Sequence, residues 1–152
     1  MATTWIGNWV WSLPLIVLTA VVHVCGLAVI ADQVLTIVGG PTVRRRFLLR
    51  FTIAMGTTSL LATLLHGIEA MFWAAAYRIL GAVPDRRTAM LYSLSAMTTY
   101  GHANIFLEAR WQLMGALEAL DGMLLFGLTT AFLFAMIQRV WPLGSIREPH
   151  RH

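Results

Sequence analysis

Two pairs of titratable side chains lie inside long apolar stretches of the sequence, where charged groups are otherwise rare. His66 and Glu69 form one pair, and Glu118 and Asp121 form the other. The members of each pair are three residues apart, so in a helix they would share one face. A metal site needs more ligands than His66 and Glu69 alone supply. We therefore predict a polar contact for this pair and no metal site.

A polar segment, 95–106 (SAMTTYGHANIF), is the second feature that could carry chemistry. It places hydroxyl groups, a glycine, a histidine and an asparagine between two apolar runs. Hydroxyl and backbone carbonyl oxygens are ligands that hard cations accept. What this segment does depends on the elements that flank it.

The composition is that of an integral membrane protein. Of the 152 residues, 58% are hydrophobic and only 12% are charged, whereas a soluble domain carries about 25% charged residues. The net charge of +4 comes from arginines at the ends of apolar runs, so membrane topology explains them better than nucleic-acid binding does. The single cysteine, Cys25, excludes a disulfide within the chain.

Three runs, 11–38, 47–80 and 111–140, exceed the about 20 residues that a membrane-spanning helix needs. Arginines 44–46 and 50 follow the first run and are the strongest topology signal, since arginine-rich loops stay in the cytoplasm. We therefore expect the N-terminus outside and the tail, 141–152, in the cytoplasm.

A further apolar run ends at Thr98 and is only about a dozen residues long, too short to cross. Pro84 and Asp85 are typical helix-start residues, so we predict a helix over 85–97 with Asp85 as its N-cap. Irregular backbone at membrane depth is tolerated only in protein or beside a water-filled cavity, and the negative end of the helix would favour a cation there. The alternative is that 85–110 is an outer loop with a helix lying on the membrane.

At these residues the sequence resembles the pore-loop potassium-channel superfamily, in its small bacterial form with a two-pore-domain-like signature. That family carries Thr-Thr-x-Gly-Tyr-Gly-Asp after a short pore helix, and TTYGHAN, 98–104, is the matching segment. EALDGMLLFGLTTAFLF, 118–134, resembles the inner helix of the family, and HGIEAMFWAAAY, 66–77, resembles its outer helix. The resemblance covers about 47–138 and leaves 1–46 as an added membrane helix and an arginine-rich loop.

The resemblance implies an all-α membrane protein with three membrane-spanning helices, a re-entrant pore helix and a filter loop, assembled as a homotetramer in the inner membrane of a bacterium. The outer helix would be 47–80 and the inner helix 111–140. The only small ligand implied is a permeant K⁺ or Na⁺. The implied ion-binding filter consists of Thr98, Thr99, Tyr100, Gly101, His102, Ala103 and Asn104. The implied pore lining consists of Met123, Phe126, Thr130 and Phe134, with Gly122 as a hinge.

The filter segment also departs from the family pattern. The family needs two glycines in left-handed conformation; Gly101 is kept, but Ala103 replaces the second, at a cost of about 1–2 kcal/mol per subunit. His102 replaces a tyrosine, Asn104 replaces an aspartate, and Tyr100 replaces a small aliphatic residue. We therefore expect weak or altered ion selectivity.

The two pairs of titratable residues would support the filter. On the family's inner helix, Glu118 and Asp121 would face the pore helix or the outer helix rather than the pore. We expect these acids either to bond to Ser93, Ser95 or His66 or to tune the filter, and both roles stay open. His66 and Glu69 would make a polar contact behind the filter.

Three functions remain in competition. The first is a cation channel, and the second is a non-conducting relative that keeps the fold for a structural or regulatory role. The third is a haem protein with His23 and His66 as axial ligands. We do not predict an enzyme, because the sequence has no nucleophile–base pair and no nucleotide-binding loop.

Overall fold

The computed structural model describes residues 2–38, 44–101 and 105–140, and within these ranges the chain is helical with no strand. The predicted all-α class is therefore confirmed. The elements in chain order are α1 (Ala2–Val38), α2 (Arg44–Ile79), α3 (Arg86–Met97), the short 3₁₀ helix η1 (Ala109–Trp111) and α4 (Gln112–Val140).

Three of these helices are long and apolar enough to cross a membrane, as the sequence predicts. Their apolar stretches are Trp5–Thr36, Phe47–Ile79 and Ala109–Arg139, of 32, 33 and 31 residues. At 1.5 Å per residue each is about 45–50 Å long, which exceeds the about 30 Å of a hydrocarbon core. The helices must therefore tilt or reach into the headgroup layers.

Helix α1 begins at Ala2, before the apolar run that starts at about Trp11 in the sequence. The segment before Trp11 contains no proline and one glycine, and nothing in it breaks a helix. Pro14 lies inside α1 without ending it. Trp5, Trp9 and Trp11 are exposed on the surface of this first part of the helix.

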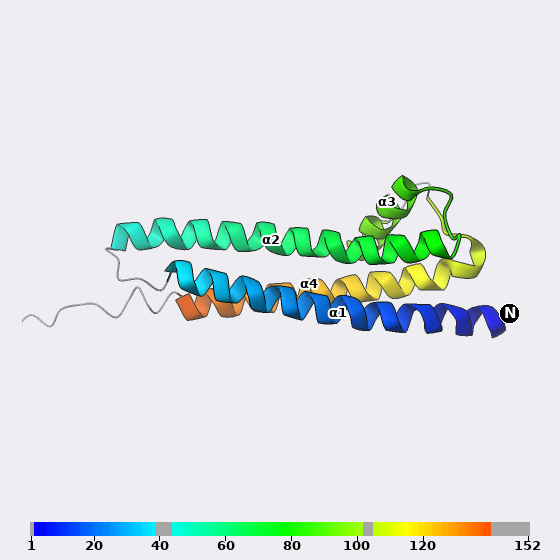
Figure 1. Ribbon diagram of the computed structural model, residues 1–152, viewed down its shortest axis with the longest axis horizontal. Coiled ribbons are helices and arrows are strands. Elements are labelled where there is room, and N and C mark those ends of the chain that lie inside the picture. Colours follow the sequence, from blue (N-terminus) through cyan, green and yellow to red (C-terminus); the bar gives the residue numbers. More distant parts are fainter. Residues whose placement is uncertain (1, 39–43, 102–104, 141–152) are drawn as a thin grey trace, which may run out of the picture.

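The long helices lie lengthwise beside one another, and α3 leans across one end of them (Figure 1). Helix α1 packs against α2 and α4, and α3 also packs against α2 and α4. The start of α1 and helix α3 share one end of the bundle, while the end of α1, the start of α2 and the end of α4 lie at the other. The arginine-rich start of α2 is thus remote from α3.

Capping residues define both ends of helix α3. Asp85 is the N-cap, and its carboxylate accepts hydrogen bonds from the backbone N–H of Thr88 at 2.9 Å and from the Thr88 hydroxyl at 2.6 Å. Thr98 is the C-cap. The helix predicted over 85–97 is therefore present with the predicted N-cap. The guanidinium of Arg78 fixes the preceding loop by donating to the carbonyls of Val83 and Pro84 at 2.8 and 2.7 Å.

Glycines allow α3 to approach α4 closely. A Cβ on Gly122 would lie 2.3 Å from the backbone oxygen of Met97, and a Cβ on Gly115 would lie 1.9 Å from the Tyr92 hydroxyl. Small residues at a helix crossing let two backbones pack tightly. The close packing against α3 explains why position 122 requires a glycine. The role of Gly122 as a hinge stays a prediction.

Asn8 connects the start of α1 to the start of α4. Its side-chain amide donates to the carbonyl of Arg110 at 2.7 Å, and its side-chain oxygen accepts from the N–H of Met114 at 2.9 Å. The first N–H groups of a helix have no partner within that helix. Asn8 therefore satisfies one of them from a different helix.

Candidate functional site

The segment that follows α3 carries the predicted filter. The N–H groups of Thr98, Thr99 and Tyr100 donate back to carbonyls of the last turn of α3, at 3.1, 2.9 and 3.0 Å. Thr99 has φ of 54° and Gly101 has φ of 80°. Both lie in the left-handed region, which is unfavourable for a β-branched residue such as threonine. The chain therefore turns sharply here, and only at Gly101 does the residue type suit that turn.

All four described residues of the predicted filter, Thr98 to Gly101, are exposed in the single chain. Tyr100 is 86% exposed, which is unusual for so large a ring. His102, Ala103 and Asn104 lie outside the described residues. No other described part of the single chain covers Thr98 to Gly101.

Glu118 joins α4 to α2 and α3. It is fully buried, and its two carboxylate oxygens accept from the Tyr77 hydroxyl, at 2.6 Å, and from the Ser93 hydroxyl. The Ser93 hydroxyl also lies within hydrogen-bond distance of the backbone carbonyl of Ala70 on α2, at 2.8 Å. The contact with Ser93 is one of those expected from the sequence. It anchors the middle of α3 to both neighbouring helices through groups shielded from lipid.

Asp121, one turn further along α4, bonds to α1 and α2. One of its carboxylate oxygens accepts from the Thr19 hydroxyl on α1 at 2.8 Å and from the indole N–H of Trp73 on α2 at 3.1 Å. Neither Ser95 nor His66 is a partner of these acids: Ser95 donates to Leu91 in its own helix, and His66 bonds to Glu69 and Thr129. Of the three expected partners, only Ser93 is correct.

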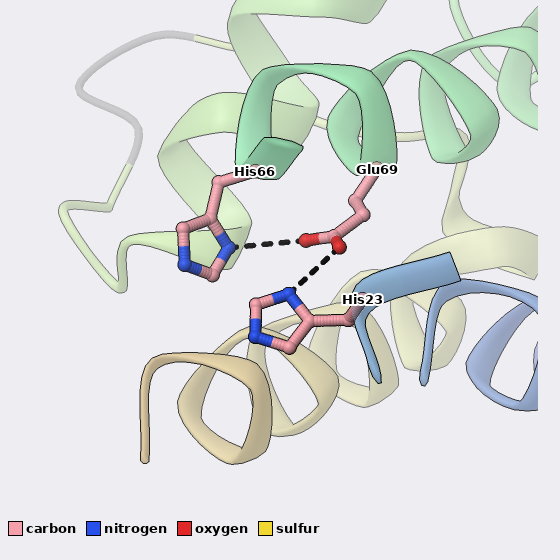
Figure 2. Close-up of side chains that lie close together, drawn as sticks. All are labelled: His23, His66 and Glu69. Carbon is pink, nitrogen blue, oxygen red and sulfur yellow. Dashed lines mark hydrogen bonds and ion pairs between the residues drawn. The ribbon is translucent and has the colours of Figure 1, made fainter. Parts of the chain in front are cut away.

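The predicted polar contact between His66 and Glu69 is present, and His23 of α1 completes it (Figure 2). Nδ1 of His23 is 2.8 Å from one oxygen of Glu69, and Nδ1 of His66 is 3.0 Å from the other. His23 and Glu69 are fully buried. One carboxylate therefore holds both imidazole rings.

Thr129 of α4 closes this cluster on the opposite side of the two rings. Its hydroxyl oxygen is 3.0 Å from Nε2 of His66 and 3.1 Å from Nε2 of His23. The ring centroids are 5.0 Å apart. In both rings Nδ1 faces Glu69 and Nε2 faces Thr129, so the rings lie side by side. A haem instead needs two ligand nitrogens that face each other across the iron, so this geometry does not fit the haem alternative.

The residues predicted to line a pore lie on the outer surface of α4 in the single chain. Met123 is 61% exposed, Phe126 40% and Phe134 60%, and Thr130 is exposed as well. Phe126 also stacks on the ring of His66, with centroids 4.2 Å apart. This face would meet either lipid or other copies of the chain, so the pore lining stays a prediction.

The partners of the buried acids were not foreseen from the sequence, apart from Ser93. The signal that could have identified His23 is its position inside an apolar run. Ionisable residues in membrane helices are costly, so such a residue is a candidate functional residue. Thr19, Trp73, Tyr77 and Thr129 gave no such signal, because hydroxyl and aromatic side chains are ordinary in membrane helices.

Comparison of the chain with protein-family models, with curated proteins and with solved structures gives no match. The resemblance to pore-loop channels therefore stays a prediction made from the motif. The geometry by itself provides a short capped helix, an exposed polar turn at its end, and a layer of buried polar side chains that connects every long helix to its neighbours.

Proposed function

We propose that four copies of the chain form a cation channel in the membrane, with one filter segment from each copy around a common axis. The observation that carries the proposal is α3. It has 12 residues, hence a length of about 18 Å, against the about 30 Å of a hydrocarbon core. It packs against both α2 and α4 and ends in an exposed polar turn, as a pore helix followed by a filter would.

The buried contacts of α3 support this proposal. An amphipathic helix that merely lies on a membrane needs no polar attachment to the helices below it. Here Ser93 is fully buried and bonds to Glu118 and to the backbone of Ala70, and Gly122 admits the backbone of Met97. The end of α3 is thus held in a fixed position, which ion coordination by backbone and hydroxyl oxygens requires.

A flux assay with purified chain in liposomes tests the proposal. Vesicles loaded with K⁺ should release it when they contain the chain and not when they lack it. Gly101→Ala should abolish flux, because a Cβ at φ of 80° strains the turn that ends the pore helix. Gly67→Ala is the matched control, since a Cβ there meets nothing within 4 Å, and flux should persist.

Absence of flux from a correctly assembled wild-type chain would contradict the proposal and favour a non-conducting relative. Selectivity is a second readout. Because of Tyr100, His102, Ala103 and Asn104, we expect the wild-type channel to discriminate weakly between K⁺ and Na⁺. The triple change Tyr100→Val, His102→Tyr and Ala103→Gly should raise the preference for K⁺. A reversal potential in mixed salt that does not move would disprove the alignment of the filter.

A further inference from the structure

The cluster of His23, His66 and Glu69 lies where α1 and α2 pack together, with Thr129 of α4 against it, and the proposed ion pathway makes no use of it. Its potential ligand atoms all lie within 4.8 Å of one another, and the three residues are buried. We propose that His23, His66 and Glu69 bind one divalent transition-metal ion, for which Zn²⁺ is the best fit. Figure 2 shows the three side chains directed toward one another.

The distances are close to those that zinc needs. Around tetrahedral Zn²⁺, with bonds of about 2.0–2.1 Å, ligand atoms lie about 3.3 Å apart. Nδ1 of His23 and Nδ1 of His66 lie 2.8 Å and 3.0 Å from different oxygens of Glu69. The rings must therefore move apart from the carboxylate to admit the ion between them. Two imidazoles and one carboxylate, with a fourth position for water, are a donor set that zinc takes in proteins.

With an ionised carboxylate and two neutral rings, the metal-free cluster is one positive charge short of satisfying its contacts, and a proton on one ring or a metal ion would supply that charge. An ionised carboxylate only accepts, so both rings must donate to Glu69 from Nδ1. A neutral ring then has a lone pair on Nε2. The Nε2 atoms of both rings face the hydroxyl of Thr129, at 3.0 and 3.1 Å. That hydroxyl has a single proton to donate. One acceptor is left without a donor unless the cluster takes up a further positive charge.

A metal ion at the two Nδ1 atoms and Glu69 would supply that charge and also satisfy both Nε2 atoms. Each ring then carries its proton on Nε2, and both N–H groups donate to the Thr129 oxygen, which has two lone pairs. Histidines that bind metals almost always donate their other N–H to an oxygen in this way. Thr129 would therefore act as the hydrogen-bond partner that orients both ligands.

Glu69 offsets part of the charge of the ion. A divalent ion in an apolar interior needs compensation, and Glu69 provides one negative charge. Since His23 comes from α1 and the other two ligands come from α2, the ion would fasten the added N-terminal helix to the rest of the chain. This inference does not depend on ion conduction.

The test uses the full chain in detergent, stripped of metal with a chelator and then titrated with Zn²⁺ and, separately, with Co²⁺. We expect one tightly bound Zn²⁺ per chain and visible absorption bands of tetrahedral Co²⁺. His23→Gln, His66→Gln and Glu69→Gln should each lower the affinity for Zn²⁺ by more than about 100-fold. Thr129→Val should lower it by about 10–100-fold, the effect of losing a ligand's hydrogen-bond partner.

Two controls separate this site from other metal-binding groups. The double change His150→Gln and His152→Gln removes the histidines of the tail, and Glu108→Gln removes an exposed carboxylate; both variants should bind Zn²⁺ as the wild type does. X-ray absorption on the zinc-loaded wild type should show two imidazole ligands, whether or not the variants fold. Absence of stoichiometric binding, or a spectrum without two imidazoles, would overturn the proposal. Binding that is lost only with the tail histidines would indicate an adventitious ion only.

Discussion

The two carboxylates of α4 each accept hydrogen bonds from two buried side chains that carry a hydroxyl or an indole group. Glu118 accepts from Tyr77 and Ser93, and Asp121 accepts from Thr19 and Trp73. A buried acceptor that loses its donor costs the full desolvation penalty of that group. Individual hydroxyls in this protein should therefore matter more for stability than their size suggests.

The change Tyr77→Phe tests this expectation. It removes the donor that lies 2.6 Å from Glu118 and keeps the buried ring, so it should destabilise the chain by about 1–3 kcal/mol. The measurement is the unfolding free energy in mixed detergent micelles, followed by circular dichroism. Tyr100→Phe is the control, because that ring is 86% exposed, and it should leave the unfolding free energy unchanged. Equal stability of both variants would mean that Glu118 does not depend on Tyr77.

The sequence indicates which residues are polar within the apolar runs but not which of them meet. His23 is 46 positions from Glu69, and Thr19 is 102 positions from Asp121. Such contacts depend on how each helix is rotated about its axis. The long helices are apolar on most sides, so the hydrophobic pattern does not identify the face that points inward. Only the spacing of three residues between His66 and Glu69 was local enough to predict.

At the scale of elements, the α3–α4 contact depends on Gly122. Gly122→Ala would place a Cβ 2.3 Å from the backbone oxygen of Met97, and a backbone cannot rotate away as a side chain does. We expect a loss of about 1–3 kcal/mol, typical of overpacking. On α2, a Cβ on Gly56 meets nothing within 4 Å, so Gly56→Ala should be neutral or stabilising by up to about 1 kcal/mol. Altered gating at unchanged stability in Gly122→Ala would instead favour the hinge.

The cap of α3 should make its stability depend on pH. Hydrogen bonds from the side chain and then from the backbone of Thr88 lower the pKa of Asp85 below its ordinary value of 3.8. Because the folded pKa is the lower one, the cap contributes fully above pH 3.8 and is lost as the pH falls through the lowered pKa. Asp85→Asn keeps an oxygen acceptor that does not titrate.

The measurement is the difference in thermal unfolding midpoint between the wild type and Asp85→Asn, from about pH 6 to about pH 2.5. The wild type should lose its advantage over the variant as the pH falls. Comparing the two chains cancels the titration of the other carboxylates. A difference that stays constant with pH would show that Asp85 contributes no charge-dependent stabilisation to α3.

For the molecule as a whole, composition and run length predicted the helices well. The short helix and its N-cap followed from Pro84, Asp85 and the length of the run before Thr98. Helix α1 extends beyond the apolar run that starts at about Trp11, because the residues before it are less apolar yet compatible with a helix. The added helix α1 proved central: it contributes Asn8, Thr19 and His23 to the polar contacts. The position of His23 inside an apolar run marks it, but the partners could not be read from 1–46, since each of the three residues bonds to a distant helix.

Assembly into a tetramer should place the outer face of α4 in water, and this distinguishes a pore from a surface covered by lipid. Met123 on α4 and Met71 on α2 are 61% and 52% exposed in the single chain. Both side chains would therefore contact lipid if the chain stayed a monomer in the membrane. In the proposed tetramer only Met123 faces the aqueous cavity. Each is changed to cysteine in a Cys25→Ser background, which removes the one native thiol.

A charged, membrane-impermeant thiol reagent applied to the protein in liposomes should then modify Met123→Cys and reduce cation flux. Met71→Cys should stay unmodified, since the thiolate that reacts forms in water and not in hydrocarbon. Native mass spectrometry of the same samples should give a mass of four chains, because one filter segment per chain cannot close a symmetric filter. A monomeric or dimeric mass, or equal protection of both cysteines, would contradict the pore.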